Sequence, residues 1–176
     1  MRTLEAAMVL TSVSPAPETG ADLISAFISK HCQPHVFTVT GGACAFILDA
    51  IGRNPDTDYV CFQHEQAAAM AADSVWRLTG KLGVTVSTSG PGATNLITGI
   101  ACSWFDSVPS FHITGQVNDA ESRAALGVNA RQIGFQETDI VSMVRPITKF
   151  AIQVHSVEEL SDALRDAYLA AVSGRM

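Results

Sequence analysis

The 176-residue sequence has few charged side chains, and it lacks an excess of positive charge. Only 16% of the residues are charged, and 11 Lys and Arg stand against 17 Asp and Glu, which gives a formal net charge of -6. Nucleic acids and anionic membrane surfaces bind basic faces, so we expect neither as a partner. The hydrophobic fraction of 47% argues against disorder and is enough for one globular domain with its own core.

The sequence also lacks closely spaced cysteines and long apolar runs. No C-x-x-C pair occurs, so we expect no metal site and predict reduced core thiols in a cytoplasmic protein for Cys32, Cys44, Cys61 and Cys102. No apolar run has the length of a membrane span, and the one near the N-terminus is too short for a signal peptide. We expect residues 1–17 to be a flexible leader and residues 18–176 to form the domain.

Several motifs of common enzyme classes are missing. Neither a Walker loop nor a G-x-G-x-x-G fingerprint is present, so ordinary nucleotide binding is weakly supported. No G-x-S-x-G elbow surrounds Ser87 or Ser89, which removes the usual argument for a hydrolase. His64-Glu65 begins like a zinc-protease helix, but Ala68 stands where the second histidine is required.

What the sequence does contain is an alternation of β-prone runs with helical segments. We expect strands at 36–40, 59–62, 83–87 and 110–114, and helices at about 19–32, 43–51, 66–78 and 95–103. Such alternation predicts an α/β fold with a parallel sheet and helices on both faces. We further expect loop over most of 118–136, a short helix at 137–144, an edge strand within 147–154, and a last helix capped by Ser156 with Glu159.

Glu65 stands where a short apolar strand gives way to an alanine-rich helix. Ligands of parallel α/β sheets bind outside the carboxyl ends of the strands, so this carboxylate is a candidate for proton exchange. Alternatively, Glu65 is an acid in the first turn of a helix, where the helix dipole favours negative charge. Gly41-Gly42 and the loop 88–95 follow two other strands, and their glycines allow tight turns or the close approach of a ligand.

The motifs occur in an order that carries a family resemblance. VFTVTGGACAFILDAI, FQHEQAAAMAAD, TSGPGATNLITGIA, TGQV, GFQETDIV and RPITKF together resemble the pyrimidine-binding N-terminal domain of thiamin-diphosphate enzymes, in particular the acetolactate synthase branch. The resemblance covers nearly the whole chain. It implies a parent enzyme that decarboxylates pyruvate or another 2-oxo acid and passes the two-carbon unit to an acceptor.

The resemblance also assigns roles to residues. It makes Glu65 the cofactor-activating glutamate, which hydrogen-bonds the aminopyrimidine ring, and it places Gln116 near the thiazolium and the substrate. Further cofactor-binding positions are Gly41, Gly42, Thr88, Pro91 and Asn95. Positions near a substrate channel are Phe135, Gln136 and Lys149.

Some features depart from the family pattern. The turn reads Thr40-Gly41-Gly42 in place of Pro-Gly-Gly, and the later segment 131–137 resembles enzymes that act on keto sugars, so the acceptor stays open. No Gly-Asp-Gly motif occurs, so we expect the diphosphate and Mg²⁺ on a separate domain of a partner chain. The use of FAD stays open. We expect a homo-oligomer and a chain that is inactive alone. Alternatives are a natural small subunit of a two-subunit 2-oxo acid decarboxylase and a noncatalytic dimerising domain.

Overall fold

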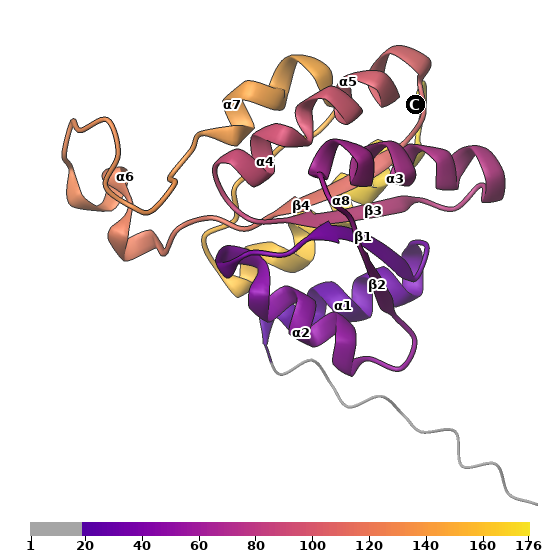
Figure 1. The fold of residues 1–176 in the computed structure, drawn as a ribbon, viewed down its shortest axis with the longest axis horizontal. Helices are drawn as coiled ribbons and strands as arrows, with labels where there is room; N and C mark the ends of the chain where they lie inside the picture. The colour runs from indigo at the N-terminus through magenta and orange to yellow at the C-terminus, as the bar shows by residue number, and fades with distance from the viewer. Residues whose placement is uncertain (1–18) are drawn as a thin grey trace, which may run out of the picture.

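The computed structural model describes residues 19–176, so the leader predicted at 1–17 lies outside the described residues. Its centre is a four-stranded parallel sheet in the order β2-β1-β3-β4 (Figure 1). The strands are β1 (His35–Val39), β2 (Asp58–Cys61), β3 (Gly83–Ser87) and β4 (Ser110–Thr114). The α/β prediction is confirmed, and the four predicted strands appear within one residue of their expected positions.

Helices cover both faces of the sheet, as predicted (Figure 1). One face carries α1 (Gly20–His31), α2 (Ala45–Arg53) and α8 (Val157–Val172). The other face carries α3 (Glu65–Thr79), α4 (Pro91–Asn95), α5 (Ile97–Asp106) and α7 (Ile140–Val144). The short elements are η1 (Gly42–Cys44), η2 (Asp119–Glu121), α6 (Arg123–Leu126) and η3 (Arg145–Ile147).

The helix starts follow the capping residues of the sequence. The Thr19 side chain accepts a hydrogen bond from the Asp22 N–H at 3.2 Å, and the Asp22 carboxylate accepts one from the Thr19 N–H at 3.1 Å. At the last helix, Ser156 Oγ accepts from the Glu159 N–H at 3.2 Å. The predicted Ser156 cap is confirmed, and both caps satisfy backbone donors that a helix start leaves unpaired.

The core is divided between the two faces of the sheet. The larger cluster packs α1, α2 and α8 on the strands, and its buried members include Ile28, Ile51, Val84, Phe111 and Leu164. The smaller cluster joins α3, α5 and α7 through Ala69, Leu96, Ile100 and Val144. All five residues of β3 are buried, because this strand is central and covered on both faces.

Polar contacts join α3 to α5 along their length. The buried Ser103 hydroxyl donates to Asp73 Oδ2 at 3.0 Å. One turn further on, the Arg77 guanidinium donates to Asp73 Oδ1 at 2.5 Å and to Asp106 Oδ2 at 2.6 Å. Together with the Ala69 cluster, these contacts fix α3 and α5 as a pair.

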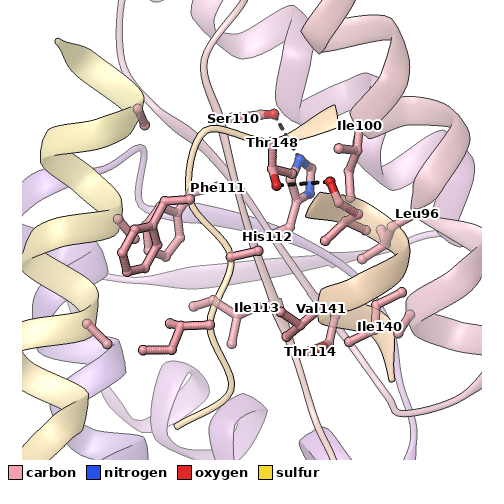
Figure 2. Close-up of a pocket in the computed structure, with 18 of the residues that line it drawn as sticks. Leu96, Ile100, Ser110, Phe111, His112, Ile113, Thr114, Ile140, Val141 and Thr148 are labelled. Atoms are coloured by element: carbon pink, nitrogen blue, oxygen red, sulfur yellow. Dashed lines mark hydrogen bonds between the residues drawn. The ribbon is translucent and has the colours of Figure 1, made fainter. Parts of the chain in front are cut away.

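The predicted edge strand within 147–154 is wrong. Residues 148–155 adopt no regular secondary structure and pair with no strand of the described chain. The physical reason is a cavity, which this segment and β4 line together, so that their backbones do not meet (Figure 2). A β-prone sequence without a neighbouring strand has no ladder to join.

Two smaller predictions also need correction. The short helix expected at 137–144 begins at Ile140, because the Asp139 carboxylate caps it by accepting from the Ser142 N–H at 3.0 Å. Only Cys32 and Cys44 are buried, whereas Cys61 and Cys102 are exposed. Cys61 belongs to β2, which forms an outer edge of the sheet, and Cys102 lies on the exposed side of α5. No helix within 19–176 combines the length and apolarity that crossing a membrane requires.

Candidate functional site

The candidate site lies at the carboxyl ends of the strands, where three connections meet. Glu65 is the first residue of α3, directly after β2, and it is only 7% exposed. His64 precedes it in an extended conformation, and His64 Nδ1 accepts from the Gln66 N–H at 3.1 Å. The imidazole therefore caps the helix, which leaves the Glu65 carboxylate free to face the other connections.

Asn95 is the partner of Glu65. It is the last residue of α4, in the connection that follows β3, and its Nδ2 donates to Glu65 Oε2 at 2.9 Å. The other oxygen, Oε1, accepts no hydrogen bond from any residue that the structure describes. The fold thus joins two predicted site residues that are 30 positions apart in the sequence, and it holds a buried carboxylate with acceptor capacity to spare.

Thr88 and two glycines form a tight cradle beside this carboxylate. A Cβ at Gly92 would lie 2.7 Å from Thr88 Cγ2 and 3.3 Å from Glu65 Oε1, and a Cβ at Gly41 would lie 2.5 Å from Thr88 Cβ. Thr88 Oγ1 also accepts from the Ala43 N–H at 3.3 Å. Both glycines are therefore required by close approach.

Gly42 and Pro91 have different surroundings. A Cβ at Gly42 would meet nothing within 4 Å, so this part of the turn faces open space. Pro91 is exposed at the first position of α4, and its carbonyl accepts from Thr94 Oγ1 at 3.2 Å. No hydrogen bond in the described structure joins Gly42 or Pro91 to Glu65, although both residues lie on the connections that surround it.

Gln116 follows β4 and turns toward a later loop. Its Nε2 donates to the Thr138 carbonyl at 2.8 Å, and its Oε1 accepts from the Val117 N–H at 3.0 Å. Gln136 lies two residues before Thr138 and has a positive φ of 58°. Phe135 is 79% exposed. The structure thus groups Gln116 with the loop of Phe135 and Gln136.

Lys149 lies apart from the other predicted site residues. Its Nζ donates to the Ser173 carbonyl at 2.5 Å, at the end of α8. Two residues after Ser173, Arg175 Nε donates to Ser107 Oγ at 3.2 Å, and Ser107 lies just before β4. Lys149 therefore lies near the amino ends of the strands, opposite the edge that carries Glu65.

His112 on β4 is a half-buried polar residue that the sequence analysis did not single out. Its Nδ1 shares a 2.7 Å hydrogen bond with Thr85 Oγ1, and its Nε2 shares one of 2.8 Å with Ser110 Oγ. Burial lowers the pKa of His112 to about 4, so the ring is neutral at pH 7. The alternation Ser-x-His-x-Thr within a β-prone run was the available signal.

Within residues 19–176, no three His, Cys, Asp or Glu side chains come together in a way that could hold a metal ion. The site instead offers a carboxylate, an amide, a hydroxyl and glycine backbone. That set can bind and orient an aromatic ring with nitrogen atoms, and it can hold a proton at Glu65.

Known proteins resemble this chain over most of its length. Residues 18–143 match the family model described as "Thiamine pyrophosphate enzyme, N-terminal TPP binding domain". The chain is 42% identical to an acetolactate synthase of Arthrospira platensis over 160 residues, which cover 89% of this chain and 26% of that protein. It is 39% identical to the acetolactate synthase isozyme 3 large subunit of Escherichia coli K12, with 89% and 26% covered.

A chloroplastic acetolactate synthase of Arabidopsis thaliana is 40% identical over 159 residues, which cover 90% of this chain and 22% of the plant protein. The chain therefore spans about a quarter of the length of these relatives. Since the family model covers the strands, the glycine turns and the Glu65–Asn95 pair, the chain belongs to the thiamine pyrophosphate enzyme family, as an N-terminal TPP-binding domain homologous to that of acetolactate synthase.

Proposed function

We propose that this chain is the cofactor-activating domain of an acetolactate synthase-like enzyme. The parent enzyme decarboxylates pyruvate or another 2-oxo acid and transfers the two-carbon unit to an acceptor, a second 2-oxo acid or a keto sugar. The observation that carries the proposal is the Glu65–Asn95 pair, a buried carboxylate with one oxygen fixed and the other open toward a glycine cradle. The activity of the parent enzyme rests on its similarity to acetolactate synthases.

The residues of the site fit the pyrimidine end of thiamin diphosphate, also called thiamine pyrophosphate. A flat ring needs room beside backbone, and the surroundings of Gly41 and Gly92 have no space for a side chain larger than hydrogen. A ring nitrogen needs a carboxyl partner, which Glu65 offers through Oε1. When bound, the cofactor supplies the electron sink for decarboxylation.

Each residue of the chain then has a physical role. The Asn95 amide orients the carboxylate, so Glu65 holds or releases a proton at a fixed position. Thr88 spaces the two glycine turns, and Gly42 and Pro91 border the ring from the turns after β1 and β3. Gln116 and its neighbours Phe135 and Gln136 face the substrate side, since the Gln116 amide anchors that loop through Thr138. Lys149 lines the same cavity as Gln116, although its ammonium donates to the Ser173 carbonyl.

The proposed partner is the diphosphate-binding domain of a second chain, which carries Mg²⁺. Two aromatic side chains beside the site are exposed to solvent: Phe46 on α2 is 83% exposed, and Phe135, in the loop before α7, is 79% exposed. Exposed apolar surface of this kind marks interfaces, so we propose a homo-oligomer in which the partner covers the site.

The chain alone is proposed to bind the cofactor weakly. One hydrogen bond to a charged group contributes about 1.5 to 3 kcal/mol, whereas association costs about 4 kcal/mol or more. We therefore expect a dissociation constant of about a millimolar or weaker for thiamin diphosphate with Mg²⁺. Titration calorimetry on residues 1–176 measures it, and micromolar affinity would contradict the proposed division of the site between two domains.

The activating role of Glu65 is tested in the full-length enzyme that carries this domain. Glu65→Gln keeps the size of the side chain and the contact with Asn95 but removes the carboxylate. We expect kcat to fall by about 10² to 10⁴-fold, the usual contribution of a positioned acid or base. The matched control is Glu121→Gln, an exposed acid on η2, which should leave kcat unchanged. Equal turnover of the two variants would refute the role of Glu65.

A further inference from the structure

Residues 118–138, which we call the arm, project beyond the carboxyl ends of the strands and carry η2 and α6 (Figure 1). Phe135 and Gln136, which the proposed function places on the substrate side, lie near the end of the arm. The Phe135 side chain is exposed, so its own packing does not fix its position. The contacts that hold the arm therefore decide where these two residues lie relative to Glu65.

The backbone of Gln136 packs against the turn that starts α4. A Cβ at Gly90 would lie 2.6 Å from Gln136 Cβ and 2.9 Å from the Gln136 carbonyl oxygen. Gln136 also has a positive φ of 58°, a left-handed conformation that is unfavourable for a residue with a side chain. Since α4 ends at Asn95, the partner of Glu65, this contact joins the arm to the element that orients the carboxylate. Surrounding contacts must hold Gln136 in this conformation.

Glu137, the next residue, contacts the start of α6. Its Oε1 and Oε2 accept from the Arg123 N–H at 3.0 and 3.2 Å, across 14 positions of the sequence. The Glu137 side chain is only 11% exposed. Burial acts to raise the pKa of Glu137, but hydrogen bonds from the backbone of Arg123 and Gly134 lower it overall, so the carboxylate is ionised at pH 7. The contact is therefore a charge-assisted hydrogen bond that closes residues 123–137 into a loop.

The backbone of Arg123, rather than its guanidinium, is the main partner of Glu137. Arg123 Nε lies 3.5 Å from Glu137 Oε2 and has no hydrogen-bond partner among the described residues. The Arg123 side chain is 38% exposed, and solvent screens an ion pair at such a position. The Arg123 N–H, by contrast, belongs to the first residue of α6 after the Ser122 cap, where a helix leaves its donors unpaired.

Two other contacts act at the base of the arm. A Cβ at Gly134 would lie 2.8 Å from both methyl carbons of Val117, and Gln116 Nε2 donates to the Thr138 carbonyl at 2.8 Å. Both contacts fix segment 134–138 beside the end of β4. Among the hydrogen bonds within residues 19–176, only those of Glu137 join this segment to α6.

We propose that Glu137 is a positioning residue, which keeps Gln136 against Gly90 by holding the start of α6. The inference rests on the proposed function, which supplies the role of Phe135 and Gln136 on the substrate side. Glu137 has no hydrogen bond to Glu65, so its loss should weaken substrate binding without removing the proton chemistry. A loss that affects the bound substrate and the transition state equally raises KM and leaves kcat unchanged.

The test compares two replacements of Arg123 in the full-length enzyme that carries this domain. Arg123→Pro removes the N–H that Glu137 accepts. Proline suits the first position of a helix, and Ser122 before it is already extended, with φ -78° and ψ 152°. Arg123→Ala removes the guanidinium but keeps the N–H, so it is the matched control. We expect KM for pyruvate to rise about tenfold or more in Arg123→Pro, as for the loss of a hydrogen bond to a charged group, and less than about threefold in Arg123→Ala.

Replacements of Glu137 approach the same contact from its other side. Glu137→Ala should raise KM as much as Arg123→Pro does, and the double variant should show no further rise, because each change removes the same contact. Glu137→Gln keeps an oxygen that accepts the Arg123 N–H, so we expect its KM to stay within about threefold of the wild type. In all of these variants kcat should change by less than about threefold.

Glu65→Gln, measured in the same assay, separates this inference from the proposed function. If Glu65→Gln lowers kcat but Arg123→Pro and Glu137→Ala keep the KM of the wild type, the positioning role is refuted and the proposed function stands. Equal effects of Arg123→Pro and Arg123→Ala, or additive effects of the Arg123→Pro and Glu137→Ala changes, would also overturn it. An unchanged kcat in Glu65→Gln would refute the proposed function, and the KM values would still decide whether Glu137 positions the arm.

Discussion

Lowering the pH below neutrality should destabilise the domain through His112. The ring is held between Thr85 and Ser110, and its burial lowers the pKa from 6.5 to about 4. Between these two pH values His112 binds a proton in the unfolded chain but not in the folded chain. The contribution of the neutral ring to the free energy of unfolding is therefore fully present above about pH 7 and is lost as the pH falls. The full pKa shift corresponds to a loss of about 3 kcal/mol of unfolding free energy, of which about 2.5 kcal/mol is reached at pH 4.5.

The ring is only half-buried and lines the cavity between β4 and residues 148–154, so solvent screening reduces the effect, and we expect a loss of about 1 to 2.5 kcal/mol of unfolding free energy between pH 7.5 and pH 4.5. That is a decrease in Tm of about 3 to 8 °C for a domain of this size. Asp22 and Asp139 do not interfere, because hydrogen bonds from Thr19 and Ser142 lower their pKa values and they titrate below this range.

Urea denaturation at a series of pH values, compared between the wild type and His112→Gln, measures the contribution of this ring. The glutamine can keep hydrogen bonds to the hydroxyls but binds no proton. We expect the variant to lose the slope between pH 6.5 and pH 4.5. The same slope in both proteins would refute the assignment of the linkage to His112.

Two further predictions concern packing and exposure. Gly41→Ala should lower the unfolding free energy, measured by urea denaturation, by about 1 to 3 kcal/mol, because the new Cβ would lie 2.5 Å from Thr88 Cβ. Gly42→Ala should change it by less than about 0.5 kcal/mol, because nothing lies within 4 Å of its Cβ position. Equal losses in the two variants would show that the turn relaxes freely. Iodoacetamide at pH 8 should label only the exposed thiols of the native protein, so mass spectrometry of peptides should find the label on Cys61 and Cys102 but not on Cys32 or Cys44. Burial also raises the pKa of Cys32 to about 12, which keeps this thiol protonated at pH 8. Rapid labelling of Cys32 would contradict its place in the core.

The strands and the Glu65 region could be predicted because local sequence determines them. β3 is a β-branched run buried on both faces, and α3 is a long run of helix formers that starts at a polar residue after a strand. The motif order then pointed to Asn95 as a site residue. Its contact with Glu65 depends on the distance between two connections, which no local pattern encodes.

Other features could not be predicted because they depend on neighbours. The run from Ile147 to Val154 has strand-forming residues, but pairing requires a second backbone within hydrogen-bonding distance, and a cavity lies there instead. Cys61 has an apolar neighbourhood in the sequence, yet its strand falls at the sheet edge. Gln116 is bound to Thr138, a residue that lies in an irregular loop.

The polar contacts between α3 and α5 have a consequence for protein engineering. Glu65 begins α3, and Asn95 directly precedes the α5 region, so the length of their hydrogen bond is set by the relative position of the two helices. Ser103 and Arg77 hold that position from the far end of the pair. The position of the carboxylate is therefore a property of segment 65–106 as a whole, and a graft of the α3 segment alone onto another parallel sheet would leave that position to the host protein.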